Sequence, residues 1–353
     1  MPRAATSIPF SDVARTEVLK GPQGTLFGRN ATAGVINIVP NVPVQEFEGF
    51  VRSRIGNEGL FRAEGMVNSP LTDKIAARAN VFYHTRDAFI DNVGIGDDLR
   101  EEGFLAGRLA IQYDITEDTS LRLAGDYEDR DENPRYSIGV SKYGFSTDPY
   151  NSKAANDVAG REETREMYGT SLQIDHGFTD ELSLFGIVSY RDWDTTNLQD
   201  EDGTEDPRRY LDSNNIEDSD ILYTEVRLNF VNDKFDIIAG ANYSEEDVYQ
   251  RTDVGILADS YMQGLTTLLL PELGISAGLD DHVWYNVEFT EDWTEADYLE
   301  ASVAASALQG SPTAVLPPSY AGAFFTETMI NEGDFTNWGI FGDVTYHLSL
   351  IHI

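Results

Sequence analysis

The chain has 353 residues and no cysteine, and its 61 acidic residues outnumber 25 basic ones, which gives a net charge of -36. Such a charge excludes nucleic acid as a partner, because an acidic surface repels phosphates. The lack of cysteine excludes disulfides and cysteine-ligated metals. No apolar run reaches the roughly 18 to 20 residues of a spanning helix, which excludes a helical membrane protein but leaves a β-barrel open.

The most informative stretch covers residues 17–39, where closely spaced glycines precede a run suited to a strand. The glycines permit tight turns, and Val35 to Val39 carries the β-branched residues of a buried strand. A P-loop does not fit, because Arg29 and Asn30 stand where that motif has Lys followed by Ser or Thr. A dinucleotide fingerprint fails on glycine spacing. The stretch therefore predicts a compact, turn-rich segment without a nucleotide site.

This stretch resembles the end of the plug domain of TonB-dependent outer-membrane receptors. The resemblance rests on Glu17, the Gly-Pro-x-Gly turn at 21–24, the Gly-Arg-Asn-Ala step at 28–31 and the Ile-Asn-Ile strand at 36–38. It implies that residues 1–40 are the C-terminal part of a plug. It also implies contacts between plug and barrel through Glu17, Lys20 and Arg29, although Lys20 stands where the family commonly has arginine and lacks its bidentate fork.

After Pro40 the sequence alternates apolar and polar residues with a period of two, which is typical of half-buried strands. The pattern predicts about ten strands, each near the roughly 9 to 11 residues that cross a bilayer at a tilt. They are expected at 47–55, 61–68, 75–86, 105–114, 120–130, 166–176, 181–191, 221–230, 235–244 and 338–348.

The connections between these strands alternate in length. Short turns are expected at 68–74, 114–119, 176–181 and 231–234, and long loops at 87–103, 131–164, 192–220 and 245–336; the short connection at 55–60 is the exception. Outer-membrane barrels alternate periplasmic turns and external loops in this way. A soluble β-sandwich is the alternative, but its loops should be more even.

Aromatic residues at the strand ends also favour the membrane, because their rings can lie at the lipid interface. Such tyrosines on the apolar face are Tyr83, Tyr113, Tyr127, Tyr168, Tyr190, Tyr243 and Tyr346. The predicted fold is therefore all-β: a partial transmembrane antiparallel β-barrel of about ten strands over residues 41–353, with the remnant of an N-terminal plug domain at 1–40.

The polar face of the early strands, which would line the barrel lumen, is rich in arginine: Arg52, Arg54, Arg62, Arg78, Arg86, Arg108 and Arg122. These arginines would either hold the plug or guide an anionic ligand, or else pair with carboxylates on neighbouring strands. The candidate carboxylates are Glu64, Asp114, Asp126 and Glu128.

No catalytic or metal-binding pattern is found. In the acidic loop 198–220, Asp200, Asp202 and Glu205 lack the third carboxylate and following glycine of a calcium loop. The five histidines show no metal-ligand spacing, and no nucleophile motif is present. The sequence therefore predicts no enzyme, no metal site and no cofactor.

The resemblance implies a receptor in the outer membrane of a Gram-negative bacterium that imports a scarce solute, by default a ferric siderophore or another iron complex. Energy would come from the inner-membrane TonB–ExbB–ExbD complex. Since the family barrel has about 22 strands, the chain is expected to be a fragment, with the coupling motif and signal peptide upstream. A receptor for an oligosaccharide or other organic nutrient and a passive porin-like barrel stay open, although the 17–39 stretch disfavours a porin.

Ligand contacts are expected on the long external loops, because loops on a rigid scaffold commonly carry binding residues. Aromatic rings there could stack on a planar or chelating ligand. The candidates are Tyr136, Tyr143 and Tyr150 in the first loop and Trp284, Tyr285, Trp293 and Tyr298 in the second.

Overall fold

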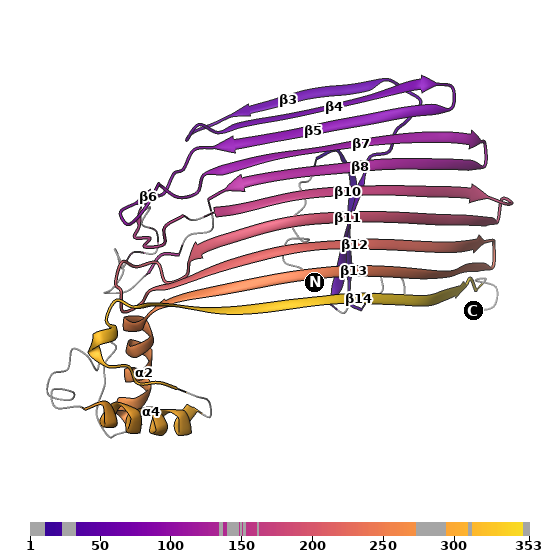
Figure 1. The fold of residues 1–353 in the computed structure, drawn as a ribbon. Coiled ribbons are helices and arrows are strands. Elements are labelled where there is room, and N and C mark those ends of the chain that lie inside the picture. The colour runs from indigo at the N-terminus through magenta and orange to yellow at the C-terminus, as the bar shows by residue number, and fades with distance from the viewer. Residues whose placement is uncertain are drawn as a thin grey trace.

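The computed structural model is dominated by one curved antiparallel sheet (Figure 1). It describes residues 11–22, 33–133, 137–139, 148, 150, 153–160, 162–272, 294–309 and 313–348. The sheet has ten strands, each paired with the next along the chain. They are β3 (Glu48–Ile55), β4 (Phe61–Thr72), β5 (Ile75–Arg86), β7 (Glu102–Thr116), β8 (Thr119–Glu132), β10 (Glu162–Gly177), β11 (Leu182–Asp200), β12 (Leu211–Val231), β13 (Phe235–Leu257) and β14 (Phe324–Tyr346). The predicted partial barrel of about ten strands is confirmed.

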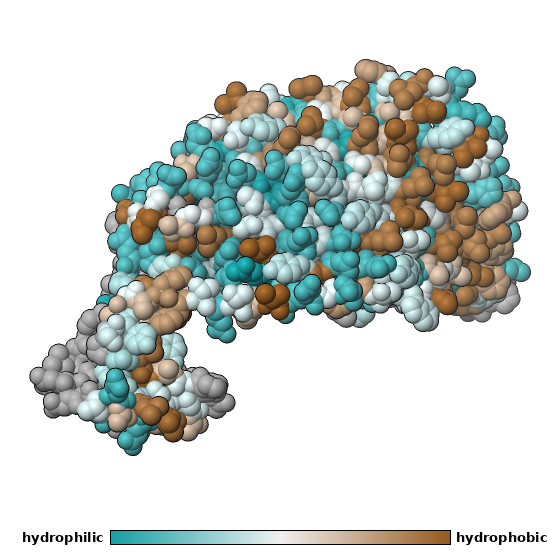
Figure 2. Space-filling model, in the orientation of Figure 1, coloured by the Kyte–Doolittle hydropathy of each residue, from teal (hydrophilic) through white to brown (hydrophobic). Residues whose placement is uncertain are grey.

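The alternation of residues sets the two faces of this sheet. Large apolar side chains on the outward, convex face are exposed, for example Val51 at 89% and Leu109 at 52%. Small or polar residues such as Ala76, Ala110 and Ala124 are buried on the inward face. On the face drawn in Figure 2, apolar residues gather toward the end of the sheet with the short turns, and hydrophilic residues toward the end with the helices. The apolar band therefore covers only part of the strand length.

Strands at the C-terminal side are longer than predicted. β11, β12, β13 and β14 have 19, 21, 23 and 23 residues. The predicted loops 192–220 and 245–336 are thus wrong in their bounds: the connections are 201–210 and 258–323. Beyond the apolar band both faces are polar, so the period of two fades, while backbone pairing continues as at Asp194 opposite Asp218.

The short turns all lie at one end of the sheet (Figure 1). In the turn between β12 and β13, the Asn232 side chain accepts hydrogen bonds from the backbone N–H groups of Lys234 at 3.0 Å and Phe235 at 2.9 Å. Such side-chain-to-backbone bonds are typical of tight turns. At the other end, the short connection after β3 turns through Glu58 and Gly59, both with positive φ.

Two smaller sheets accompany the large one. β1 (Val13–Lys20) pairs with β2 (Gly34–Pro40) in an antiparallel hairpin. β6 (Asp91–Asn92) pairs in parallel with β9 (Lys153–Ala154), which ties the connection after β5 to the connection after β8. The second pair lies on the side of the long connections (Figure 1).

The connection between β13 and β14 contains a helical insert, where sequence analysis expected a loop. It consists of α2 (Ala258–Glu272), α4 (Glu295–Gln309) and the short 3-10 helix η2 (Pro318–Tyr320). Ala258, Met262, Leu265, Tyr298, Ala305 and Val315 form its buried core. In the described part of the chain, neither helix is long and apolar enough to cross a membrane.

Candidate functional site: the hairpin contact, the lumen wall and the outer rim

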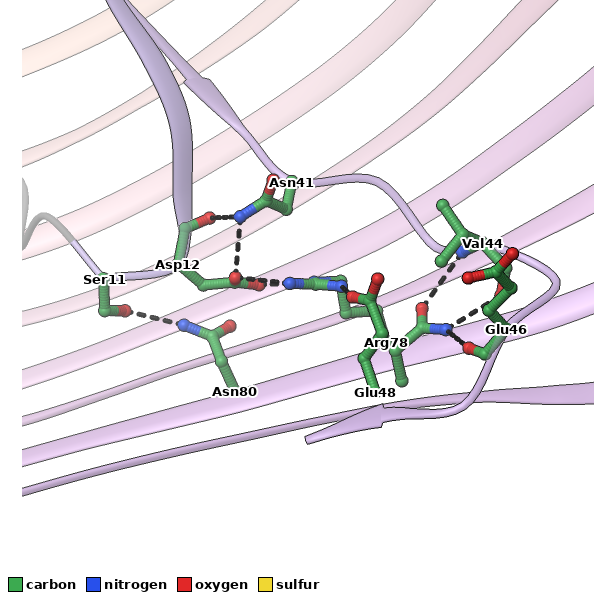
Figure 3. Close-up of polar contacts among 9 residues, drawn as sticks. Ser11, Asp12, Asn41, Val44, Glu46, Glu48, Arg78 and Asn80 are labelled. Carbon is green, nitrogen blue, oxygen red and sulfur yellow. Dashed lines mark hydrogen bonds and ion pairs between the residues drawn. The ribbon is translucent and has the colours of Figure 1, made fainter. Parts of the chain in front are cut away.

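The β1–β2 hairpin is attached to the sheet through Arg78 on the inward face of β5 (Figure 3). Arg78 Nε and Nη2 donate to the two carboxylate oxygens of Asp12, each at 2.6 Å, and Nη1 donates to Glu48 at 2.8 Å. The side chains of Arg78 and Asp12 are 7% and 8% exposed. Two parallel hydrogen bonds from one guanidinium fix both distance and orientation. The pair therefore joins the start of the hairpin to the sheet in a single geometry.

Further polar contacts surround this ion pair (Figure 3). Asn80 donates to the Ser11 hydroxyl at 2.6 Å, and Asn41 donates to the Asp12 side chain at 2.8 Å. Asn68, which is fully buried, donates to the backbone carbonyls of Val44 and Glu46. Both ends of the hairpin are thereby held against β4 and β5.

Of the three residues predicted to join plug and barrel, the structure describes Glu17 and Lys20. Glu17 accepts hydrogen bonds from Arg15 at 2.6 Å and Asn37 at 2.9 Å, both within the hairpin. Lys20 is exposed at the end of β1. Arg29 lies outside the described residues. Asp12, which forms the long-range contact, was missed, because a single aspartate before a strand gives no sequence signal.

Two other inward arginines pair with carboxylates on neighbouring strands, as the second interpretation of the arginine-rich face predicted. Arg52 binds Glu64 at 3.2 Å and Arg108 binds Asp126 at 2.6 Å, each across neighbouring strands. Among the ion pairs of the described residues, the Arg78–Asp12 pair links the inward face to the hairpin segment, so each of the two interpretations of the arginine-rich face holds for part of it.

Farther along the inward face, a buried polar group lines the lumen beside the outer loops. Trp193 is 3% exposed and donates its indole N–H to Glu217 at 2.7 Å, and Gln250 donates to the other Glu217 oxygen at 3.0 Å. Arg165 pairs with the buried Glu128. Sequence analysis missed this group, although the position of Trp193, three residues after the outward Tyr190, already placed it on the opposite face.

The predicted ligand contacts are only partly described. Tyr150 is 92% exposed between β8 and β10, whereas Tyr298 is 7% exposed in the core of the helical insert. Tyr136, Tyr143, Trp284, Tyr285 and Trp293 lie outside the described residues. The two described residues thus lie in different connections, and the role of all seven residues in binding stays a prediction.

On the outward face, the predicted tyrosines mark the limit of the apolar band. Tyr168 packs against Tyr127, which lies directly opposite on the neighbouring strand; the ring centroids are 5.2 Å apart and the rings are tilted by 45°. Tyr168 is in turn opposite Asp192. The same cross-strand row continues through β11 to β14 with four facing aspartates, namely Asp192, Asp220, Asp247 and Asp334. Like charges in facing positions destabilise a sheet, so this row is a costly feature of the outer rim.

A second acidic group lies within the outer connections. One oxygen from each of Asp157, Asp200 and Asp202 lies within 4.8 Å of the others. Burial and the charge of Asp202 raise the pKa of Asp157 to about 7. Burial raises the pKa of Asp200 to about 6, against the opposing effect of a hydrogen bond from the Gly203 backbone. Here the fold supplies the third carboxylate that the loop sequence lacks.

An antiparallel meander with an apolar, tyrosine-bordered outer face, a polar inner face and a hairpin bound inside defines the wall of a membrane β-barrel with a plug-like insert. No family model matches the sequence. The ferripyoverdine receptor of Pseudomonas aeruginosa is 33% identical over 127 residues, which are 35% of this chain and 15% of that receptor. The catecholate siderophore receptor Fiu of Escherichia coli is 28% identical over 176 residues, 48% of this chain and 22% of that receptor.

Solved structures agree in fold. The ferric yersiniabactin uptake receptor FyuA from Yersinia pestis has a TM-score of 0.59 at 18% identity, over 70% of this chain and 40% of that chain. The resemblance to TonB-dependent outer-membrane receptors is thereby confirmed, and the chain has the fold of a segment of such a receptor. It matches less than a quarter of the length of either curated receptor.

Proposed function

We propose that the chain is part of an outer-membrane receptor that imports a ferric siderophore or a similar iron complex. The observation that carries this proposal is the match to receptors named for ferripyoverdine and catecholate siderophores, together with the shared barrel fold. The outward apolar band, bordered by tyrosines such as Tyr168, supports a place in the bacterial outer membrane.

Residues 1–40 would be the end of the plug and 41–353 the first part of the barrel. The buried Arg78–Asp12 pair supports this division, because it joins the hairpin to the lumen side of the barrel wall. The TonB–ExbB–ExbD complex would act on the plug from the periplasm. A force applied there would have to displace the Arg78 contacts before the hairpin could move, since both charges are buried and each satisfies the other.

Ligand capture would take place at the end of the sheet with the long connections. The helical insert lies in one of these connections, and Tyr150, which is 92% exposed, lies in the connection between β8 and β10. Leu257 and Phe324, which flank the insert, are paired opposite each other on β13 and β14. The insert can therefore be removed without changing the strand register.

The test is a receptor that carries this chain and lacks residues 258–323, with an Asn-Gly turn joining Leu257 to Phe324. Such a two-residue turn closes an antiparallel hairpin. We expect normal insertion into the outer membrane and loss of radiolabelled ferric siderophore uptake, together with loss of growth under iron limitation.

A control makes the result specific. Asp233→Gly, in the short turn between β12 and β13, should leave uptake unchanged. Undiminished uptake without the insert would place recognition elsewhere in the receptor. Uptake of an oligosaccharide by the unaltered receptor, in place of the iron complex, would overturn the proposed cargo and support the nutrient-receptor alternative.

A further inference from the structure

Two arginines face each other across the first two strands of the sheet, beside the connection 56–60. Arg54 of β3 and Arg62 of β4 are directly opposite in register, both on the inward face. On its other side, Arg62 is opposite His84 of β5. The β3–β4 connection lies at the end of the sheet with the long connections (Figure 1). Like charges in facing positions destabilise a sheet, so the arginine pair is a costly arrangement near the mouth of the barrel.

The neighbouring carboxylates on this face have other partners. Glu64 binds Arg52 at 3.2 Å. Glu102 binds His84 at 2.8 Å. Within the part of the chain that the structure describes, neither arginine of the facing pair forms an ion pair with a carboxylate. The chain has 61 acidic residues against 25 basic ones, and yet these two positive charges are not balanced by any described side chain.

An aromatic platform holds the guanidinium of Arg62. Its Cζ atom lies over the Phe82 ring, 4.5 Å from the centroid. Phe82 is 8% exposed and packs edge-on against Phe104, with centroids 5.6 Å apart. A guanidinium over an aromatic face keeps its N–H donors in its own plane, where they can still bind an acceptor. The donors of Arg62 are thus oriented in advance, which lowers the cost of ordering a side chain on binding.

We propose that Arg54 and Arg62 bind an oxyanion, a carboxylate or phosphate group, on the lumen wall. Each guanidinium can match such a group with two parallel hydrogen bonds. One anion between the two arginines would replace their mutual repulsion by two attractions. Arg108, farther along the same face, needs no such partner, because it already pairs with Asp126 at 2.6 Å.

The site would favour solutes that carry carboxylate or phosphate groups, whether or not they carry iron. A chain with a net charge of -36 repels anions in general, so a local cationic contact near the mouth would offset that repulsion for a solute entering the lumen. This use in import rests on the proposed function, whereas the binding itself does not.

The first experiment measures binding of citrate and of inorganic phosphate to a receptor that carries this chain, by isothermal titration calorimetry in about 0.15 M salt to screen weak surface binding. We expect a saturable site for at least one of the two anions, and the tighter of them identifies the preferred class. Arg54→Gln and Arg62→Gln should each weaken binding about tenfold or more, as expected for the loss of a charged hydrogen-bond donor. Arg62→Lys should weaken it less, because lysine keeps the charge and loses the fork.

The matched control is Arg108→Gln, which removes an inward arginine that already has a carboxylate partner. It should leave the affinity for either anion unchanged. Equal affinities of Arg62→Gln and the unaltered receptor would place anion binding elsewhere and overturn the proposal. The absence of a saturable site for both anions would overturn it as well. Iron uptake is not measured, so a negative result here does not bear on the proposed cargo.

A second measurement separates a binding role of Arg54 from a structural one. In the anion-free receptor, Arg54→Gln should keep or raise the free energy of unfolding measured by urea titration, because it removes the repulsion from Arg62. A lower free energy of unfolding would show that Arg54 has a stabilising partner on another strand, and the proposed site would then be refuted.

Discussion

At the scale of single residues, Arg78 joins three parts of the chain: its own strand, Asp12 before β1 and Glu48 at the start of β3. Removing one partner of a buried ion pair leaves the other charge uncompensated, which costs about 3 to 5 kcal/mol. We expect Arg78→Ala to release the hairpin, with faster amide hydrogen exchange in β1 and β2. Arg78→Lys should restore part of the protection, because it keeps the charge and loses the fork.

The matched control for Arg78 is Arg52→Ala. Arg52 also pairs with a strand neighbour, Glu64, but its side chain is 70% exposed. Because this pair joins two strands of the sheet and does not involve the hairpin, exchange in the hairpin should stay at the level of the unaltered chain. If Arg78→Ala behaves like Arg52→Ala, the ion pair does not hold the hairpin.

Leu172 tests the assignment of the outward face. It is 49% exposed on β10, between the outer Tyr168 and the turn at Gly177. Leu172→Arg should destabilise the barrel by about 2 to 4 kcal/mol, because its charge would enter lipid. Ser171→Arg is the control, since Ser171 lies on the inward face, opposite Ala124 and Ser189. The free energy of unfolding of each variant is measured by urea titration in lipid vesicles. Equal values for the two variants would show that Leu172 does not face lipid.

At the scale of elements, we expect the helical insert to unfold independently of the sheet. Met262 is 1% exposed in its core. Truncation of a buried methionine costs about 2 to 5 kcal/mol, so Met262→Ala should speed exchange in α2 and α4 and leave β13 and β14 protected. Val303→Ala, at a position 65% exposed on α4, should change nothing. Loss of protection in β13 as well would mean that insert and sheet fold as one unit.

An element could be predicted where its two faces differ in burial, because the difference produces a periodic pattern of apolar and polar residues. The ten strands have a lipid face and a lumen face, so a period of two revealed all of them. The outer ends of the strands were not predicted. Residues 192–200, for example, are largely polar on both faces and form a strand through backbone pairing with β12. The start of α4 did have a signal: Thr294 and Asp297 form a capping box, in which the Asp297 carboxylate accepts from the Thr294 N–H and hydroxyl.

The candidate sites depend on contacts between distant residues and were harder to predict. Arg78 and Asp12 are separated by 66 positions. The sequence around either residue does not indicate that the other is its partner. The same holds for Asp157, whose partners lie on the β11–β12 turn. A carboxylate's neighbours in space follow from strand order and register, which single-sequence patterns do not contain.

At the scale of the whole molecule, the sheet is open. Within the described residues, β3 and β14 each have only one neighbour, and β14 offers an edge of 23 residues. Unpaired edges promote association. In detergent, the 353-residue chain should therefore self-associate with rising concentration, as measured by light scattering.

Phe335→Lys provides the comparison for this self-association. It would place a charge on the edge strand at a position that is 49% exposed, and charged residues on an edge discourage pairing with another chain. The variant should associate less than the unaltered chain. A compact monomer of the unaltered chain at all concentrations would mean that the two edges meet and close a small barrel.

The facing aspartates at the outer rim, Asp192, Asp220, Asp247 and Asp334, set two forces against each other on the same strands. Backbone hydrogen bonds draw the strand ends together, and the charges push them apart over a range of about 10 Å in 0.1 M salt and about 30 Å in 0.01 M salt. The embedded halves of the strands cannot respond, because lipid and the lumen polar network hold them. We therefore expect the outer ends of β11 to β14 to separate more readily in dilute salt than in concentrated salt, because salt screens the repulsion between these aspartates.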